Sequence, residues 1–325
     1  MIKSVLKQLY TKCSWPFLPN GVYCFNYHRI GDEEKSAFDP NVFSCTEQRF
    51  EQHIKFFNDK FVPISVEQLI EKIENNTKLD KKYALITFDD GYIDNYEVAY
   101  PILKRYNTPA AFYIATDYLD APHIPWWDEI AWIVRHTKVP SIKLTNWQES
   151  IDISNSSAIE KIRKVLRVIK QDQSRTMPDK IAELENVCQC HIPDSLRNSS
   201  LFINWQQAKE MSDNGMHIGS HTLSHSILSH LNETEQKKEI EQSKAIIEQH
   251  LNKATTSIAY PVGGRSAFSK LTQQLAKQAG YKLAFSFIPG VVLSFAADQR
   301  YQLRRLPVDG NCTVKELKNI IVKNK

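Results

Sequence analysis

Residues 83–91 have the sequence YALITFDDG, in which a mostly apolar run stops at two aspartates and a glycine. A short apolar run that ends at a turn residue is typical of a buried β-strand. Seven more runs of this kind occur, at residues 21–27, 61–64, 110–115, 216–219, 257–260, 283–287 and 303–306. The sequence therefore predicts seven or eight strands.

Segments with helical periodicity separate most of these runs. They cover residues 47–57, 66–74, 95–106, 205–213, 233–251 and 270–279. Strands that alternate with helices predict a parallel sheet, and eight such repeats predict a closed barrel. We therefore expect an α/β fold, in the form of a distorted (β/α) barrel with seven or eight strands.

One interval breaks the alternation. Residues 117–200 contain no convincing strand, whereas residues 160–169 and 179–187 have the pattern of polar amphipathic helices. We interpret 117–200 as a helical insertion within one domain that covers residues 21–325. Residues 1–20 form a basic amphipathic segment, which fits either contact with an anionic membrane surface or packing on its own domain.

Composition excludes several classes of protein. The chain has 325 residues, of which 42% are hydrophobic, so it can bury a large core. A net charge of +4 is too small to indicate a nucleic-acid partner, and no dinucleotide or P-loop motif occurs. The six cysteines form no paired CxxC array, and the N-terminus lacks the pattern of a secretory signal. These features predict reduced thiols and a cytoplasmic protein, either free or peripheral on the inner face of the cell membrane.

Polar residues follow the predicted strands where the strands end. In a parallel barrel, loops at the carboxyl ends of the strands share one rim, which is where functional groups gather. The residues placed at this rim are Tyr27, His28, Arg29, Asp89, Asp90, His221, His225, Pro261, Val262, Arg304 and Arg305.

Asp89, Asp90, His221 and His225 together indicate a metal site. Adjacent carboxylates repel each other unless a cation or a shared proton relieves them, although a plain capping turn is the alternative for Asp-Asp-Gly. Histidines four residues apart lie on one face of a helical turn, where both can bind one ion. One carboxylate and two histidines leave a position for water, as in catalytic zinc sites, and the second carboxylate is then available as a base.

Several motifs resemble those of the polysaccharide deacetylases, the carbohydrate esterase family 4 or NodB-homology group. The motifs are residues 86–92 (ITFDDGY), 221–225 (HTLSH), 26–30 (NYHRI) and 259–263 (AYPVG). The resemblance implies a distorted barrel of the NodB type and metal-dependent removal of N-acetyl groups from amino sugars. It assigns Asp89 as the general base, Asp90, His221 and His225 as ligands of a divalent metal, most simply Zn²⁺, and the Val262 amide as an oxyanion donor.

The chain departs from the family pattern at two positions. An arginine that steadies the base usually opens the third motif, but Ala259 stands there, so we expect Arg304 or Arg305 to supply the charge. Neighbouring residues on a strand point to opposite faces, so only one of the two arginines should reach the site. The histidine that usually ends the last motif is absent from residues 303–306, which makes His28 the candidate general acid.

Four aromatic or acidic residues are further candidates for contact with the substrate or the oxyanion. Tyr92 and Tyr260 belong to the motifs, and Trp127 and Asp128 open the insertion. An aromatic ring beside a carboxylate suits a sugar, although tryptophan is more often a core residue.

The sequence thus predicts a metal-dependent hydrolase of C–N bonds that deacetylates an amino sugar in a cell-envelope polysaccharide or a glycolipid precursor. The expected partner is an N-acetylated sugar, free or lipid-linked, and no nucleic acid. Two alternatives remain: a hydrolase of a non-sugar amide, and a carbohydrate-binding relative that has lost its activity. The sequence does not determine the sugar, the metal or the oligomeric state.

Overall fold

A computed structural model describes residues 11–120, 122, 124–295 and 299–325 of the protein. The chain forms two compact units. Unit 1 contains Met1–Gly31, Phe43–Asp120 and Phe202–Lys325, and unit 2 contains Asp32–Val42 and Ala121–Leu201. The first ten residues of the predicted membrane-contacting segment lie outside the described residues.

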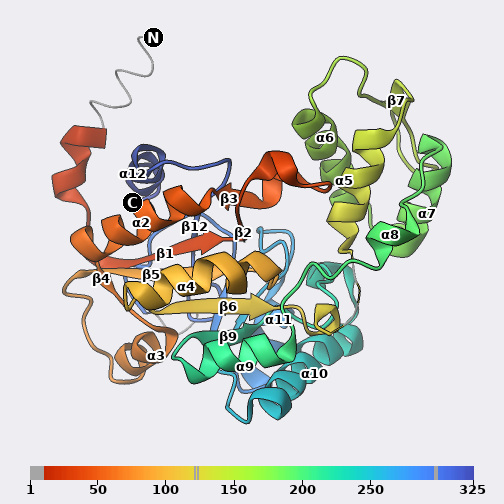
Figure 1. The fold of residues 1–325 in the computed structure, drawn as a ribbon. Helices are drawn as coiled ribbons and strands as arrows, with labels where there is room; N and C mark the ends of the chain where they lie inside the picture. The colour runs from red at the N-terminus through yellow and green to blue at the C-terminus, as the bar shows by residue number, and fades with distance from the viewer. Residues whose placement is uncertain (1–10, 121, 123, 296–298) are drawn as a thin grey trace. The chain divides into compact units, whose positions relative to one another are not determined.

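Unit 1 is built on a parallel sheet with the strand order β11-β10-β9-β6-β5-β1-β12, and β4 pairs with β5 (Figure 1). Each of the eight predicted runs overlaps a strand, the last one at Leu306 only, and the predicted α/β fold is confirmed. The strands are β1 (Gly21–Tyr27), β4 (Val62–Pro63), β5 (Lys82–Phe88), β6 (Ala110–Ile114), β9 (His217–Ser220), β10 (Ser257–Ala259), β11 (Leu283–Phe285) and β12 (Leu306–Pro307). Two further strands, β2 (Arg29–Ile30) and β3 (Phe43–Cys45), pair with each other.

The end of the chain brings the two edges of the sheet together. Leu303 forms a parallel bridge with Phe285 of β11, whereas Leu306 of β12 pairs with Phe25 of β1. A segment of a few residues therefore contacts β11 at one edge of a curled sheet and adds β12 beside β1 at the other. This curl agrees with the predicted distorted barrel.

Helices connect the strands of unit 1 along the chain (Figure 1). They are α2 (Glu47–Lys60), α3 (Val66–Glu74), α4 (Tyr100–Arg105), α9 (Trp205–Asp213), α10 (Glu233–Leu251), α11 (Lys270–Gln278) and α12 (Val314–Lys323), with short 3-10 turns at Trp15–Phe17, Thr116–Tyr118 and Leu228–His230. Side chains at the N-termini cap α2, α3, α9, α10, α11 and α12, which satisfies amides that have no partner within the helix.

The helix predicted over residues 95–106 is divided in two. Asn95–Ala99 form a π-helical turn (η4), and α4 begins at Tyr100. Pro101 has no N–H to donate to the preceding turn. The Tyr100 amide donates to the carbonyl oxygen of Asn95, five residues earlier, and not to that of Tyr96, as it would in an α-helix. This wide turn directly follows the loop that carries the two aspartates.

The core of unit 1 lies between the sheet and its helices. Phe88 of β5 stacks on Phe112 of β6 with ring centroids 4.7 Å apart, and Phe25 of β1 packs on Phe57 of α2 at 4.2 Å. These aromatic contacts fix adjacent strands and so set the positions of the loops that follow them.

Unit 2 is mainly helical. It contains α5 (Trp126–His136), α6 (Ala158–Gln171), α7 (Met177–Cys188) and α8 (Asp194–Arg197), 3-10 turns at Glu33–Lys35 and Pro40–Val42, and an antiparallel pair of β7 (Ser141–Ile142) and β8 (Ile151–Asp152). Most of it corresponds to the predicted insertion, and α6 and α7 cover the two predicted helices. The addition of Asp32–Val42 was not predicted.

None of the helices formed by the described residues is long and apolar enough to span a membrane.

Candidate active site and metal centre

The predicted site residues of unit 1 follow the carboxyl ends of parallel strands. His28 comes after β1, Asp89 and Asp90 after β5, His221 after β9, and Val262 after β10. Because these strands pair in parallel in one sheet, their ends meet at one edge. The fold therefore gathers five side chains or amides from four separate strand ends.

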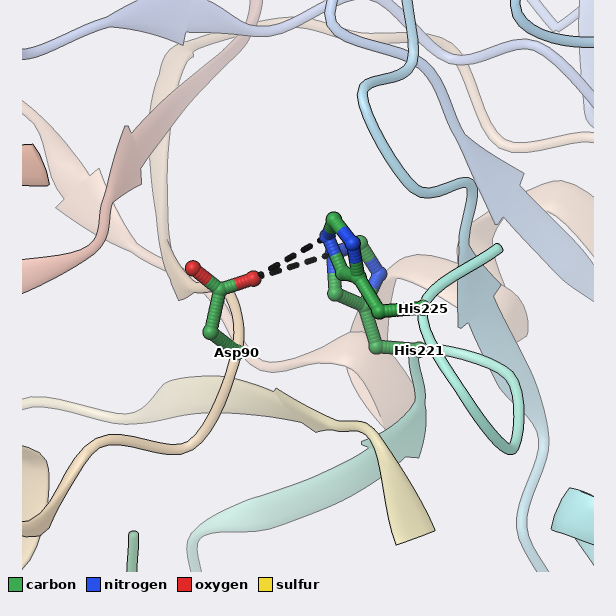
Figure 2. Close-up of side chains that lie close together, drawn as sticks. All are labelled: Asp90, His221 and His225. Carbon is green, nitrogen blue, oxygen red and sulfur yellow. Dashed lines mark ion pairs between the residues drawn. The ribbon is translucent and has the colours of Figure 1, made fainter. Parts of the chain in front are cut away.

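Asp90, His221 and His225 form a buried cluster whose ligand atoms all lie within 4.8 Å of one another. Asp90 Oδ1 lies 3.4 Å from His221 Nε2 and 3.3 Å from His225 Nε2, and Figure 2 shows both rings turned toward this oxygen. Asp90 Oδ1 is buried and accepts no well-aligned hydrogen bond from the described residues. A cation between the carboxylate and the two rings would satisfy it.

The hydrogen bonds of His221 leave one ring nitrogen available to a metal. Its Nδ1 lies 2.7 Å from the carbonyl oxygen of Ala259, so Nδ1 carries the proton and donates it there. Nε2 is then the unprotonated nitrogen of the neutral ring and faces Asp90. Partners of this kind orient histidine ligands in metal sites.

Opposite charges dominate the protonation of the cluster. Burial raises the pKa of Asp90, but the neighbouring His221 and His225 outweigh it and hold that pKa well below the usual range. Burial lowers the pKa of His221, but Asp89 and Asp90 outweigh it and raise that pKa. The site is thus built to keep Asp90 ionised and to place positive charge beside it.

Asp89 is held by Arg305. Two guanidinium nitrogens donate to the two carboxylate oxygens, Nη1 to Oδ1 and Nη2 to Oδ2, each at 2.7 Å. Asn26 Nδ2 also donates to Oδ2, at 3.2 Å. Burial raises the pKa of Asp89, but Arg305 outweighs it and the pKa lies below the ordinary value. Asp89 is therefore an oriented, ionised carboxylate.

The two arginines proposed to replace the missing charge have different environments. Arg305 is completely buried, and its Nε also donates to the carbonyl of Ser286 at 2.8 Å. Arg304 is exposed, and its side chain lies beside Gly290. As expected, only one of the two arginines reaches the site, although both precede β12 (Leu306–Pro307) and neither lies in a strand.

The prediction that His221 and His225 lie on a helical turn is wrong. Residues 221–225 form a loop in which Thr222 and His225 have φ values of 68° and 55°. Both histidines still reach Asp90, with ring centroids 4.7 Å apart. The rings therefore converge because the loop reverses direction, not because of helical spacing.

Glu239 of α10 holds this loop and was not predicted. Its Oε2 accepts hydrogen bonds from the amides of Leu223 at 2.9 Å and Ser224 at 3.1 Å, and its Oε1 accepts one from Ser224 Oγ at 2.7 Å. A carboxylate that receives three bonds can fix a left-handed backbone that isolated residues avoid. Nothing in the pattern of a long polar helix distinguishes this glutamate from its neighbours.

His28 is half-buried and sits beside the aspartates. His28 lowers the pKa of both aspartates, with a smaller effect than Arg305 has on Asp89 and than the two other histidines have on Asp90. Asn95 of the π-helical turn donates to the His28 carbonyl at 2.7 Å, and Ser44 accepts from its amide at 3.1 Å. The backbone around the proposed general acid is therefore fixed from two sides.

Val262 has an unusual backbone conformation. Its φ of 60° lies in the left-handed region, which is costly for a β-branched residue and is found where a site requires it. Gly263 follows with a φ of 56°, and a Cβ there would lie 2.6 Å from the Phe287 amide nitrogen. The turn therefore needs a glycine at 263, and it determines the direction of the Val262 amide.

Four residues predicted to contact the substrate or the oxyanion are buried. Tyr92 is 0% exposed beside Phe202, and Tyr260 is 1% exposed with its hydroxyl donating to the Tyr301 carbonyl at 3.0 Å. In unit 2, Trp127 is 5% exposed. Asp128 is 0% exposed and accepts from the Asp39 amide at 3.0 Å. Contact of these four side chains with a substrate stays a prediction.

Known proteins share the family and the fold. The polysaccharide deacetylase family matches residues 76–284. The candidate polysaccharide deacetylase YxkH of Bacillus subtilis is 23% identical over 82% of this chain and 67% of its own length. The poly-beta-1,6-N-acetyl-D-glucosamine N-deacetylase of Escherichia coli O157:H7 is 25% identical, over 47% of this chain and 22% of that protein.

Solved structures agree on the fold. The Streptococcus pyogenes deacetylase PplD, in complex with acetate, has a TM-score of 0.61 and 22% identity, covering 93% of this chain and 99% of that chain. IcaB from Ammonifex degensii has a TM-score of 0.59 and 16% identity, covering 94% of this chain and 98% of that chain. The family match spans more than half of the sequence. It includes strand β5, the two aspartates that follow it and the loop with the two histidines. The chain therefore belongs to the polysaccharide deacetylase family.

Proposed function

We propose that this protein is a metal-dependent hydrolase that removes the acetyl group from an N-acetylated amino sugar. The observation that carries the proposal is the convergence of two different sets of groups at one edge of the sheet. One is the cluster of Asp90, His221 and His225, and the other is Asp89 held by Arg305. A set of metal ligands next to an ionised base suits hydrolysis of an amide.

The donor set fits a divalent cation of the zinc type. One carboxylate oxygen and two imidazole nitrogens are the ligands of open catalytic zinc sites, and the Ala259 carbonyl orients one of the rings. When bound, such an ion supplies a Lewis acid that polarises an acetamide carbonyl and makes water more acidic.

The remaining steps belong to the side chains and the backbone. Asp89 accepts the proton of the attacking water, and Arg305 keeps the carboxylate ionised and oriented for this transfer. The Val262 amide donates to the oxygen that gains negative charge. His28 delivers a proton to the leaving amine, from a position close to both aspartates. The products are acetate and a free amino sugar.

The relatives support an amino sugar as substrate. Proteins of Escherichia coli and Staphylococcus aureus that match this chain are named poly-beta-1,6-N-acetyl-D-glucosamine N-deacetylases. The chain spans only 22% and 38% of their lengths, so their substrate is a proposal for this protein. The absence of an arginine from the third motif does not favour an inactive relative, because Arg305 contacts the base.

The test is release of acetate by purified protein supplied with Zn²⁺, Co²⁺ or Mn²⁺. The substrates are N-acetylglucosamine oligomers, soluble N-acetylhexosamines and, for comparison, cyclic amides and ureides. Release of acetate from the sugars, lost on chelation and restored by metal, supports the proposal. Ring opening of the cyclic amides without release of acetate would contradict it.

We further propose that the protein works in the cytoplasm, at the inner face of the cell membrane. The support is the charge of Lys3, Lys7 and Lys12, because each basic residue near an anionic surface contributes about 1 kcal/mol. Co-sedimentation with anionic liposomes tests this, using the full chain and one that lacks residues 1–16. Equal binding by both chains would contradict the membrane contact.

A further inference from the structure

A pocket in unit 1 carries positive charge and belongs to no part of the mechanism above. It has a volume of about 690 Å³, within the range of ligand-binding sites. Three cationic side chains line it, from Arg265, Lys270 and Lys277, and no described residue of the lining is acidic.

The three cations are available to a ligand. Each is exposed, and none forms an ion pair or side-chain hydrogen bond with another described residue. Lys270 and Lys277 are seven residues apart on α11, so they lie on the same helix face. The glutamines at positions 273 and 274 lie between them and also line the pocket. This face of α11 offers several hydrogen-bond donors and a net positive charge.

The interior of the pocket is partly apolar. Phe268, Ile288 and Tyr301 also line it and are less exposed than the three cations. The ring of Phe268 stacks on Tyr260 at 4.6 Å, and the Tyr301 hydroxyl donates to the Tyr281 carbonyl at 3.1 Å, so both rings are fixed. A lining that combines exposed cations with fixed apolar side chains suits an anionic group that is joined to an apolar or aromatic one.

The pocket is connected to the candidate active site through the backbone. Arg265 stands two residues after Gly263, in the turn that sets the Val262 amide. On the other side, the Ile288 carbonyl accepts from the amide of Arg305 at 3.2 Å. The loop 261–265 and the segment 286–288 thus each have one end at the site and the other in the pocket wall.

We propose that this pocket binds a phosphate or diphosphate group of the substrate, so that the amino sugar presented to Asp89 is a phosphate ester. This inference rests on the proposed deacetylation. Phosphoryl oxygens accept bonds from both lysine and arginine, and the negative charges of a diphosphate diester are attracted by the three cations. A neutral glycan gains nothing from these cations, and a partly deacetylated one, being cationic, is repelled.

The test uses the full chain loaded with metal and three variants of it. The first is the double variant Lys270→Gln/Lys277→Gln, and the second is Arg265→Gln. The third, Lys315→Gln, is a matched control, because Lys315 is an exposed lysine of α12 outside the pocket. Calorimetry measures binding of uridine diphosphate, which requires no turnover. Kinetics of acetate release compare uridine-diphosphate N-acetylglucosamine with the neutral methyl glycoside of N-acetylglucosamine.

The proposal predicts that the double variant weakens binding of uridine diphosphate about tenfold or more and raises KM for the phosphorylated sugar by a similar factor. Its kcat and KM for the neutral glycoside stay unchanged, and Lys315→Gln behaves as wild type. If uridine diphosphate binds at the metal instead, its affinity is the same for all variants. Binding that none of the pocket variants weakens would overturn the proposal.

Two further comparisons separate the remaining cases. Vesicles that carry a polyprenyl-diphosphate N-acetylglucosamine replace the soluble nucleotide sugar. If deacetylation of the lipid-linked sugar requires Lys270 and Lys277, the phosphate belongs to a lipid carrier. If only deacetylation of the soluble sugar requires the two lysines, the phosphate belongs to a nucleotide. If uridine diphosphate binds through the lysines but no sugar releases acetate, the proposed function fails and the pocket stands. If neutral sugars are deacetylated and the lysines have no effect, only the pocket assignment fails.

Discussion

Arg305 and Asp89 are 216 positions apart in the chain and form a two-point ion pair with both contacts at 2.7 Å. The guanidinium is fully buried, so neither charge is screened by water. A buried charge that loses its partner is strongly destabilising. This pair therefore serves both the stability of the barrel and the protonation state of the proposed base.

Replacement of Arg305 should have a far larger effect than replacement of its neighbour. Arg305→Ala is expected to abolish acetate release and to lower the free energy of unfolding by about 3–5 kcal/mol, because Asp89 remains buried without its counter-charge. Arg304→Ala is the matched control and should remain near wild type, since Arg304 is exposed. The measurements are kcat and denaturant unfolding. Equal effects of the two variants would contradict the assignment.

Glu239 should control metal affinity without contacting the metal. Glu239→Gln replaces one of the carboxylate oxygens that accept hydrogen bonds from the loop carrying His225. We expect the Kd for Zn²⁺ to rise about ten- to hundredfold. Glu241→Gln, on the exposed face of the same helix, is the control and should bind zinc as wild type does. A competition assay with a chromogenic chelator measures both. Unchanged affinity in Glu239→Gln would show that the loop holds its shape without this carboxylate.

Each metal ligand should be required separately. Asp90→Ala, His221→Ala and His225→Ala should each lose bound zinc, because two protein ligands rarely retain an ion at an open site. Elemental analysis after dialysis measures the metal content. Full occupancy in all three variants would remove the metal assignment.

A buried histidine of the core should make stability depend on pH. Burial lowers the pKa of His53 from 6.5 to about 4, and its Nδ1 lies 3.0 Å from the Tyr27 hydroxyl. Between these values the unfolded chain binds a proton that the folded chain does not, so stability falls as pH falls. The expected loss between pH 6.5 and 4 is about 3 kcal/mol.

The control for this effect is His53→Gln, which removes the titrating group. Denaturant unfolding of both proteins at several pH values measures the difference. As the pH falls from 6.5 to 4, the free energy of unfolding of the wild type should decrease more than that of the variant. Parallel curves for the two proteins would show that His53 does not titrate in this way.

The sequence was sufficient for the order of the strands and for the polar residues that follow them. Residues 21–27, 66–74, 205–213 and 233–251 were predicted with the bounds that the structure gives to β1, α3, α9 and α10. These elements have a strong period or clear capping residues, and the parallel topology then places their ends together. The convergence of Asp90 with the two histidines followed from this topology.

Other features depend on long-range contacts that no local pattern contains. The choice between Arg304 and Arg305 depends on which side of the last segment faces the barrel interior. The loop of His221 and His225 takes its shape from Glu239, fourteen positions after His225 in the sequence. Asn26 donates a hydrogen bond to Asp89 and belongs to the motif at residues 26–30, but it was not predicted as a site residue. Its position in the alternation of side chains along β1 was the signal that could have identified it. Asp32–Val42 joins unit 2 through contacts distant in sequence, such as that of Asp39 with Asp128.

The most direct test of the central claim is acetate release by Asp89→Asn compared with wild type, with metal content measured on the same samples. The account predicts full zinc occupancy in both proteins and about a 10²- to 10⁴-fold lower kcat in the variant, because Asp89 acts as base and is not a ligand. Because the variant leaves the buried Arg305 without its counter-charge, lower stability is expected, and denaturant unfolding of the same samples establishes that the compared proteins are folded. Retention of wild-type kcat by a zinc-loaded Asp89→Asn protein would contradict the account.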